Sequence, residues 1–329
     1  MESIYIVFER NQRKSNKKII FLVTIIMTLL FCSSFLSGCT QLKQSITYDG
    51  RTRHYVLHLP LSYNPGKKTP LVVVLHGGGG NADNIQETTE MNTKADKEGF
   101  IVVYPEETGP LPNRFLTWNG GYCCGYAPKH NVDDVGFIRF LINYLKQKIS
   151  IDNQRIYITG FSNGAIMAYR LGAELSDIIA AIAPVAGSIG GNATENTSYW
   201  EIPTPTTPVS VIAFHGRRDA RIPFDGGKPT IENTKGAYIY ASVNHSIAFW
   251  VTNNHCNPEP QINISANGNI IITTYSGGNN QTEVVLYTIV DGTHAWPGGK
   301  PGWFGGDEPT QDISATDLMW DFFVQHPKK

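Results

Sequence analysis

Ser162 lies in a Gly-x-Ser-x-Gly pattern, two residues after Gly160 and two residues before Gly164. An apolar, strand-like run covers residues 155–159 before it, and a helix-like run covers residues 165–171 after it. A sharp turn from a strand into a helix strains the backbone, and only small neighbours two residues to either side avoid a clash. The pattern therefore predicts a serine presented at the apex of such a turn, near the positive end of the following helix.

A serine hydroxyl needs a base to become a nucleophile, and the usual base is a histidine held by a carboxylate. In α/β-hydrolases these groups follow the chain order serine, acid, histidine, each on a loop after a strand. Asp219 follows an apolar run that ends at Phe214, and His294 follows one that ends near Val290. We therefore predict a catalytic triad of Ser162, Asp219 and His294.

Two other carboxylates compete with Asp219 for the role of the acid. Asp291 is so close to His294 in sequence that it is better suited to shaping the turn. Asp225 lies further from the end of the preceding strand. Asp219 is therefore the preferred acid.

A run of glycines after His76 is the candidate source of backbone N–H groups that would stabilise an oxyanion. His76 and the four glycines at residues 77–80 follow a continuous apolar run at residues 71–75. Glycine lets backbone N–H groups approach a substrate oxygen, and esterases use such a loop to stabilise the oxyanion. We predict an oxyanion hole made by the N–H of Gly78, with Gly79 as second choice, and the N–H of Asn163. A phosphate-binding loop is disfavoured, because no Lys-Ser/Thr pair follows.

The N-terminus has the pattern of an export signal. A basic stretch at residues 10–18 precedes an uncharged apolar segment at residues 19–36, and a small-residue sequence then ends in Cys39. We expect a lipoprotein-type signal peptide at residues 1–38, lipidation of Cys39, and attachment to the bacterial cell envelope through that lipid. An uncleaved signal anchor and ordinary cleavage with secretion are the alternatives. All three place the body of the protein outside the cytoplasm.

Composition and cysteine usage fit an exported globular enzyme. The 329 residues are 41% hydrophobic and 17% charged, and the formal net charge of −1 gives no electrostatic footprint for nucleic acid. Beyond the signal region, three cysteines remain, and adjacent cysteines rarely bond each other because the ring that they close is strained. We therefore expect Cys256 to pair with Cys123 or Cys124, although three free buried thiols are also compatible with the sequence.

Strand-like and helix-like runs alternate along the body of the chain, which predicts a mostly parallel sheet with helices on both faces. We expect a helix beginning at Asp133 or Asp134, and we expect irregular insertions at residues 187–208 and 298–310. Neither insertion looks like an interdomain linker. The sequence therefore predicts a tether at residues 39–45 and one catalytic domain at residues 46–329.

A set of short motifs resembles the polyhydroxybutyrate depolymerase / feruloyl esterase family over residues 45–325. They are His76-Gly77-Gly78-Gly79, Trp118-Asn119, Cys123-Cys124-Gly125, residues 132–137, residues 160–164, His215-Gly216 with Asp219, and residues 294–299. The resemblance implies a secreted or lipoprotein α/β-hydrolase with a mostly parallel twisted sheet. It also implies hydrolysis of carboxylic esters through an acyl-serine, with no cofactor and no metal. Many members have a methionine or another residue where this chain has Asn163, a difference that we expect to affect the pocket more than the mechanism.

The substrate pocket is less well marked in the sequence. Trp118 and Trp296 are candidates to line it, although tryptophans more often anchor a core. No carbohydrate- or polymer-binding module is visible beside the catalytic domain, which favours small or oligomeric esters. Two other functions remain open. One is a serine peptidase of the prolyl-oligopeptidase type, and the other is a non-catalytic surface lipoprotein that keeps the hydrolase fold.

Overall fold

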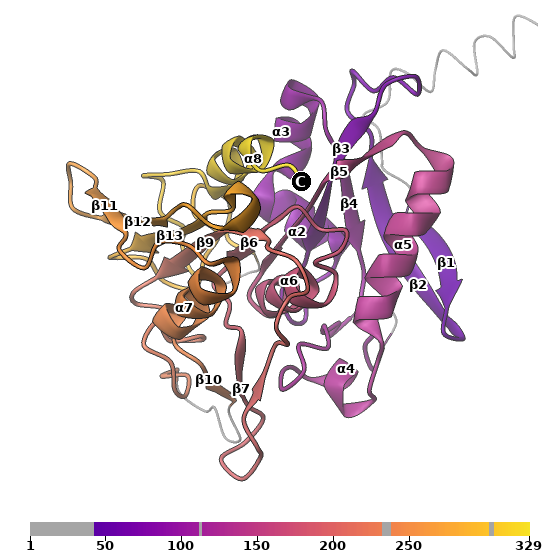
Figure 1. The fold of residues 1–329 in the computed structure, drawn as a ribbon. Coiled ribbons are helices and arrows are strands. Elements are labelled where there is room, and N and C mark those ends of the chain that lie inside the picture. Colours follow the sequence, from indigo (N-terminus) through magenta and orange to yellow (C-terminus); the bar gives the residue numbers. More distant parts are fainter. Residues whose placement is uncertain (1–42, 112–113, 232–237, 303–305) are drawn as a thin grey trace, which may run out of the picture. The chain divides into compact units, whose positions relative to one another are not determined.

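A computed structural model describes residues 43–111, 114–231, 238–302 and 306–329 (Figure 1). The chain from Lys43 to Lys329 forms one unit by its internal contacts. The predicted signal peptide and Cys39 lie outside the described residues. Among the residues that are described, no helix is long and apolar enough to cross a membrane. Strand β1 begins at Gln44, so the last two residues of the predicted tether are part of the sheet.

The main sheet of the described residues has the strand order β1-β2-β4-β3-β5-β6-β9-β13-β12-β11. Its centre, from β4 to β13, is parallel, and antiparallel strands extend it at both edges. The strands are β1 (Gln44–Tyr48), β2 (Arg51–His58), β3 (Thr69–Leu75), β4 (Ile101–Pro105), β5 (Ile151–Phe161), β6 (Ala181–Val185), β9 (Ser210–Gly216), β11 (Gln261–Ile264), β12 (Ile270–Tyr275) and β13 (Val284–Ile289).

Helices cover both faces of this sheet, as Figure 1 shows. On one face lie α5 (Asp134–Lys148), α6 (Asn163–Glu174) and α7 (Val243–Asn254), and on the other lie α2 (Ala82–Thr89), α3 (Met91–Glu98) and α8 (Ala315–Gln325). Short elements complete the described part: α4 (Tyr126–Lys129), the 3-10 turn η1 (Asn279–Gln281), and a second small sheet of β7 (Gly190–Asn192), β8 (Trp200–Glu201) and β10 (Ile239–Tyr240).

Successive side chains of a strand point to opposite faces, so each central strand contributes to two cores. In β3, Leu71 and Val73 pack with the helices of the first face, whereas Val72 and Val74 pack with those of the second. All of these side chains are fully buried. This is why the central strands have continuous apolar sequences rather than alternating ones.

The predicted layered arrangement is confirmed, and so are the strands and helices expected along the parallel part of the chain. Helix α5 begins at Asp134, and the side chain of Asp133 caps it by accepting a hydrogen bond from the Gly136 N–H (2.9 Å). Sequence reasoning missed α2 and α3, because they are mostly polar and bury only a few side chains each. It also missed β7 and β8, which lie inside the insertion predicted at residues 187–208.

The predicted pairing of Cys256 with Cys123 or Cys124 is wrong. Cys123 and Cys124 are bonded to each other across a cis peptide bond, and Cys256 is a buried free thiol. Cys256 follows α7 and lies 3.8 Å from the carbonyl oxygen of Thr282. Cys123 and Cys256 belong to different clusters of buried residues.

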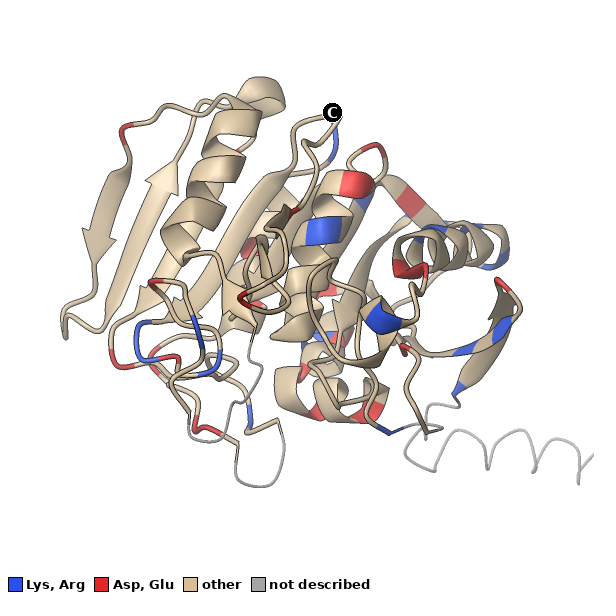
Figure 2. Ribbon diagram, turned by 90° about the horizontal axis from the view of Figure 1, so that it is seen from below, with Lys and Arg blue, Asp and Glu red and all other residues tan. Residues whose placement is uncertain are grey.

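Lys and Arg positions are interspersed with Asp and Glu positions along the ribbon in Figure 2, in keeping with the small net charge. Some charged residues are buried, and two of them form an ion pair in which the Arg53 guanidinium lies 2.7 Å from Asp134 Oδ1. The guanidinium also stacks on the Phe137 ring at 3.7 Å. The other oxygen of Asp134 accepts a hydrogen bond from the Asn119 N–H (2.8 Å). The start of α5 therefore holds β2 and the loop at residues 117–119 together.

Replacing Asp134 with alanine should lower the free energy of unfolding by about 3–5 kcal/mol, because it leaves the buried guanidinium of Arg53 uncompensated. Urea unfolding followed by tryptophan fluorescence measures the change. Asp177→Ala is the matched control, since it breaks the solvent-exposed pair with Arg139 (2.7 Å). That loss should stay below about 1 kcal/mol. Equal losses in the two variants would contradict the structural role given to Asp134.

Candidate active site

Ser162 lies at the sharp turn between β5 and α6. Its backbone angles are φ 57° and ψ −119°, a region that L-residues rarely adopt. The turn is held by the Ser162 N–H, which donates to the Val185 carbonyl (3.0 Å). A Cβ on Gly160 would lie 2.4 Å from the Gly164 carbonyl oxygen, and one on Gly164 would lie 2.5 Å from the Leu75 carbonyl oxygen. Both glycines are therefore required by close backbone contacts, as the sequence pattern predicts.

Asp219 and His294 come from loops that follow neighbouring parallel strands, β9 and β13. Asp219 Oδ2 lies 2.7 Å from His294 Nδ1, and both side chains are buried. The two loops touch through Gly216, where a Cβ would lie 2.3 Å from the Gly292 carbonyl oxygen. The structure thus brings together the acid and the histidine that the sequence singled out.

Asp219 is satisfied on both of its oxygens. Oδ1 accepts hydrogen bonds from the backbone N–H groups of Arg221 (2.8 Å) and Ile222 (2.9 Å). Oδ2 accepts from His294 and also lies 3.4 Å from His215 Nε2. Burial opposes ionisation of this carboxyl, but the charge of His294 and the hydrogen bonds from both histidines outweigh it. The pKa of Asp219 is therefore held well below its usual range, and the group is a carboxylate at neutral pH.

The two competing carboxylates point elsewhere. Asp291 lies on the surface, where its Oδ1 is 2.6 Å from the guanidinium of Arg218. Asp225 is exposed. A different carboxylate, Asp307, accepts a hydrogen bond from the backbone N–H of His294 (2.9 Å) and so helps to fix the loop that carries the histidine.

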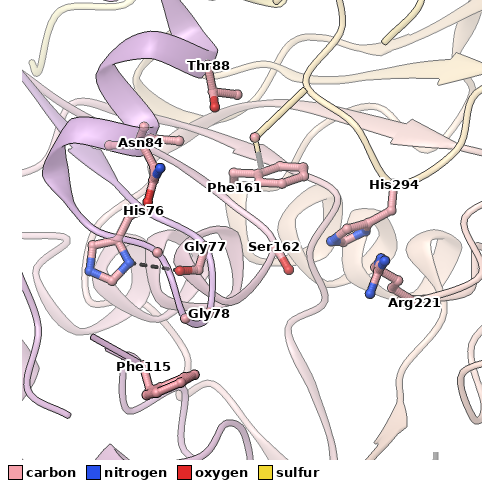
Figure 3. Close-up of a pocket in the computed structure, with 14 residues that line it drawn as sticks. His76, Gly77, Gly78, Asn84, Thr88, Phe115, Phe161, Ser162, Arg221 and His294 are labelled. Carbon is pink, nitrogen blue, oxygen red and sulfur yellow. Dashed lines mark hydrogen bonds between the residues drawn. The ribbon is translucent and has the colours of Figure 1, made fainter. Parts of the chain in front are cut away.

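Ser162 and His294 line one cavity of about 390 Å³, together with the glycine loop (Figure 3). No hydrogen bond joins the Ser162 hydroxyl to His294 within the described residues, although both side chains face the same space. Hydrogen bonds between catalytic groups are often long before substrate binds, so this separation is compatible with a working pair.

The predicted oxyanion donors differ in their availability. Among the described residues, the Gly78 N–H has no hydrogen-bond acceptor, and a Cβ on this glycine would be 3.5 Å from Asn163. The N–H of Asn163 is the first in α6, where backbone donors lack an intrahelical acceptor. The Gly79 N–H, in contrast, donates to the Leu116 carbonyl (2.7 Å). The assignment of Gly79 as an alternative donor is therefore corrected, and Gly78 with Asn163 remains the candidate pair.

Trp118 and Trp296 do not line the cavity, which corrects the predicted pocket. Both indoles are buried in the core. Trp296 donates its indole N–H to Thr316 Oγ1 (3.0 Å), and Trp118 donates its own to the His76 carbonyl (3.0 Å). Apolar packing around both rings, rather than proximity to the catalytic histidine in sequence, determines where they lie.

Trp118 connects the glycine loop to the serine turn. Its backbone N–H donates to Asn163 Oδ1 (2.7 Å), and its carbonyl accepts from Asn163 Nδ2 (3.1 Å). The Asn163 side chain therefore anchors a loop instead of shaping the pocket, contrary to the sequence-based expectation.

His76, at the start of the glycine loop, is also buried, and its Nδ1 lies 2.8 Å from the Gly77 carbonyl oxygen. Burial lowers the pKa of His76 to about 4, so the side chain of this histidine is uncharged at neutral pH.

The buried carboxyl group of Glu107 supports the loop at residues 117–119 that contains Trp118. Glu107 Oε2 accepts a hydrogen bond from the Thr117 N–H (3.0 Å), and Oε1 accepts one from the Thr108 hydroxyl (2.8 Å). Burial and the nearby charge of Asp134 raise the pKa of Glu107 to about 9. The Glu107 side chain is therefore protonated and neutral in the folded protein at pH 7.

Several residues of the cavity wall were not expected from the sequence. They are Asn84, Ile85, Thr88, Phe115, Phe161, Arg221 and Gly302. Phe161 directly precedes Ser162, and Arg221 lies two residues after Asp219, so their positions carried a signal that the motif search did not use. The others come from α2 and from loops whose approach to Ser162 depends on tertiary packing.

The arrangement provides a strained serine, a buried carboxylate–histidine pair and two backbone donors around one cavity. This combination is suited to attack on a carbonyl carbon and to stabilisation of the resulting oxyanion. Within the described ranges, no group of three or more His, Cys, Asp or Glu side chains is arranged to hold a metal ion.

Comparisons with known proteins relate the chain to esterases. Residues 53–214 match the family model described as esterase PHB depolymerase. The chain is 29% identical to feruloyl esterase B of Piromyces equi over 252 residues, covering 76% of this chain but only 44% of that protein. It is 27% identical to poly(3-hydroxyalkanoate) depolymerase C of Paucimonas lemoignei over 290 residues, covering 85% of this chain and 67% of that protein.

A solved structure shows the same fold. An acetyl xylan esterase from Aspergillus awamori aligns with a TM-score of 0.55 at 14% identity, covering 86% of this chain and 99% of that chain. The likeness confirms the α/β-hydrolase fold that the sequence predicts.

Glu107 should make the stability of the protein fall as pH rises. The folded state keeps a proton on Glu107 up to about pH 9, whereas the unfolded chain loses it near the ordinary value of about 4.3. Between these values the free energy of unfolding should decrease by up to about 1.4 kcal/mol per pH unit from this group alone. Glu107→Gln keeps a neutral side chain and should remove this dependence.

Urea unfolding at intervals from pH 5 to pH 9 measures the difference between Glu107→Gln and the wild type. The difference should grow with pH in favour of the variant. Glu259→Gln, at an exposed position, should follow the wild type throughout. Parallel curves for Glu107→Gln and the wild type would show that Glu107 is already ionised in the folded protein.

Proposed function

The chain belongs to the PHB depolymerase family of esterases, and from that premise we propose that it hydrolyses carboxylic esters with Ser162, His294 and Asp219 as a catalytic triad. The observation that carries the proposal is the buried hydrogen bond of 2.7 Å between Asp219 and His294. It lies at the same cavity as the strained serine. A scaffold that only binds has no need for these elements together.

The first half of the reaction forms an acyl-serine. The Ser162 oxygen attacks the carbonyl carbon of the ester while His294 Nε2 accepts the hydroxyl proton. The carbonyl oxygen becomes an oxyanion, which the N–H groups of Gly78 and Asn163 stabilise; each such donor typically contributes about 3–4 kcal/mol. Collapse of the tetrahedral intermediate breaks the bond to the alcohol oxygen, and the protonated His294 gives that oxygen its proton.

The second half returns the enzyme to its starting state. His294 removes a proton from water, whose oxygen attacks the acyl carbon, and the same two N–H groups stabilise the second oxyanion. The acid then leaves as Ser162 regains its proton from His294. Asp219 stays ionised throughout, because its low pKa keeps it a carboxylate. It orients the imidazole and stabilises the imidazolium that forms in each half.

We also propose that the enzyme acts outside the cytoplasm. The support is the sequence of residues 1–39, in which a basic stretch and an apolar segment precede Cys39. Lipidation of Cys39 would keep the catalytic domain at the cell envelope, close to ester substrates that arrive from outside. Fractionation of cells that express the wild type or Cys39→Ser tests the anchor, since the variant should lose lipid-dependent recovery in the membrane fraction.

Ser162→Ala should reduce ester hydrolysis by about 10⁴- to 10⁶-fold, because triad residues act as a unit. The measurement is kcat/KM of purified protein on p-nitrophenyl butyrate, methyl ferulate and soluble hydroxybutyrate oligomers. An aminoacyl-proline anilide in the same panel tests for a peptidase of the prolyl-oligopeptidase type.

Hydrolysis of one ester class, lost in the variant, supports the proposal and names the acyl preference. A residual rate within tenfold of the wild type would rule out Ser162 as the nucleophile. Cleavage of the anilide alone would assign the protein to the peptidases, and no cleavage of any compound would favour the binding scaffold.

A further inference from the structure

A second cavity, of about 450 Å³, lies between α7 and the strands β12 and β13. We call it the α7 groove. Side chains of these three elements line it, together with Pro258 and with Arg217 and Phe224 from the loop after β9. The groove shares no lining residue with the cavity at Ser162. Its volume is that of a site for a small organic ligand, so it is a second candidate binding site in this molecule.

One face of α7 forms a wall of the groove. Asn244, Ile247, Ala248, Val251 and Thr252 line it at the three- and four-residue spacings of a helix face. Ile247 and Val251 are buried, whereas Ala248 and Thr252 are exposed. The apolar face of this helix therefore continues from the core into the groove.

The opposite wall is the sheet face of β12 and β13. Ile271 is paired with Thr288, and Thr273 with Leu286, so these four side chains lie on the same face. In Figure 1, α7 lies beside the end of the sheet that β13, β12 and β11 form. No charged residue occurs from 260 to 282, the stretch that contains β11 and β12. The sheet side of the groove is thus apolar with two hydroxyl groups and no charge.

Arg217 supplies the one charge of the groove, since no other described residue that lines it is ionic at neutral pH. The Arg217 backbone N–H donates to the Ile289 carbonyl (2.9 Å), which places this residue at the carboxyl end of β13, next to Thr288. The guanidinium lies over the Phe224 ring, 5.0 Å from its centroid. Stacking of this kind engages the flat face of the guanidinium and leaves the N–H groups at its edge able to donate.

The two arginines after β9 differ in their partners. Arg218 pairs with Asp291 at 2.6 Å. The Arg217 side chain, in contrast, makes no ion pair with a carboxylate within the described ranges. Asp225 follows Phe224 in the sequence, but it does not line the groove. The groove therefore combines one positive charge with an uncharged, largely apolar bed.

We propose that the α7 groove binds a carboxylic acid that has an apolar chain, with the carboxylate at Arg217 and the chain between α7 and β12. The paired N–H groups of a guanidinium match the two oxygens of a carboxylate. The single positive charge balances the single negative charge of such a ligand, and burial of its chain against Ile247 and Ile271 stabilises the complex. This inference goes beyond the proposed function, because the groove lies apart from the Ser162 cavity and requires no catalysis.

The test compares octanoate with octanamide, which has the same chain and no charge. Isothermal titration calorimetry gives the Kd of each, and the readout is the ratio of the two values. The wild type should bind octanoate about 5- to 10-fold more tightly, between the effect of an exposed ion pair and that of a hydrogen bond to a charged group. Arg217→Gln should bring the ratio close to 1, and Arg217→Lys should keep part of the preference.

Two further variants assign the binding to the groove. Arg218→Gln is the matched control, because it removes a neighbouring charge that does not line the groove, and it should keep the wild-type ratio. Ala248→Trp places an indole in the groove from an exposed position on α7, and it should abolish the binding of both compounds. The thermal unfolding midpoint of each variant shows that it is folded.

Equal affinities of the wild type for the two compounds would overturn the proposal, and so would a ratio that Arg217→Gln leaves unchanged. Octanoate binding that survives in folded Ala248→Trp would place the acid elsewhere on the molecule. A wild-type dimer that Ala248→Trp dissociates, seen by sedimentation velocity, would assign the groove to a second copy of the chain instead. Octanoate binding in a protein that hydrolyses no ester would contradict only the proposed function.

Discussion

The backbone turn at Ser162 is the constraint on which the site depends. A positive φ at a serine is stable only when the surrounding structure leaves no alternative. Here β3, β5 and α6 meet with backbone in contact with backbone, because Gly160 and Gly164 have no Cβ to separate them. The same contacts bring the end of β3, and the glycine loop that follows it, to the first turn of α6. The nucleophile and the oxyanion donors are thus placed by one packing arrangement.

A chain of buried polar contacts fixes the glycine loop and the loop at residues 117–119 relative to the serine turn. The Asn163 side chain binds both the backbone N–H and the carbonyl oxygen of Trp118, and the Trp118 indole N–H donates to the His76 carbonyl. Behind them, Asp134 joins Asn119 to Arg53. Buried polar groups are costly unless they are satisfied, so each of these contacts excludes alternative positions of the loop. The catalytic geometry is therefore supported mainly by groups that never touch the substrate.

The sequence predicted what depends on local pattern and chain order. The alternation of apolar runs with helical runs gave the layered sheet, and the position of Asp219 and His294 after consecutive parallel strands was sufficient to pair them. It failed where the outcome depends on tertiary contacts. The indole of Trp296 and the thiol of Cys256 are buried by neighbours distant in sequence. The N–H of Gly79 is engaged by Leu116, which no motif reveals.

The most direct test of this account is peptide mapping by mass spectrometry after reaction with a fluorophosphonate, which modifies only an activated serine. The account predicts one adduct on the peptide that contains Ser162, formed much faster in the wild type than in Asp219→Ala, because His294 then loses the carboxylate that orients it. An adduct on another serine, or no adduct on the folded protein, would contradict the claim that the buried Asp219–His294 pair activates Ser162.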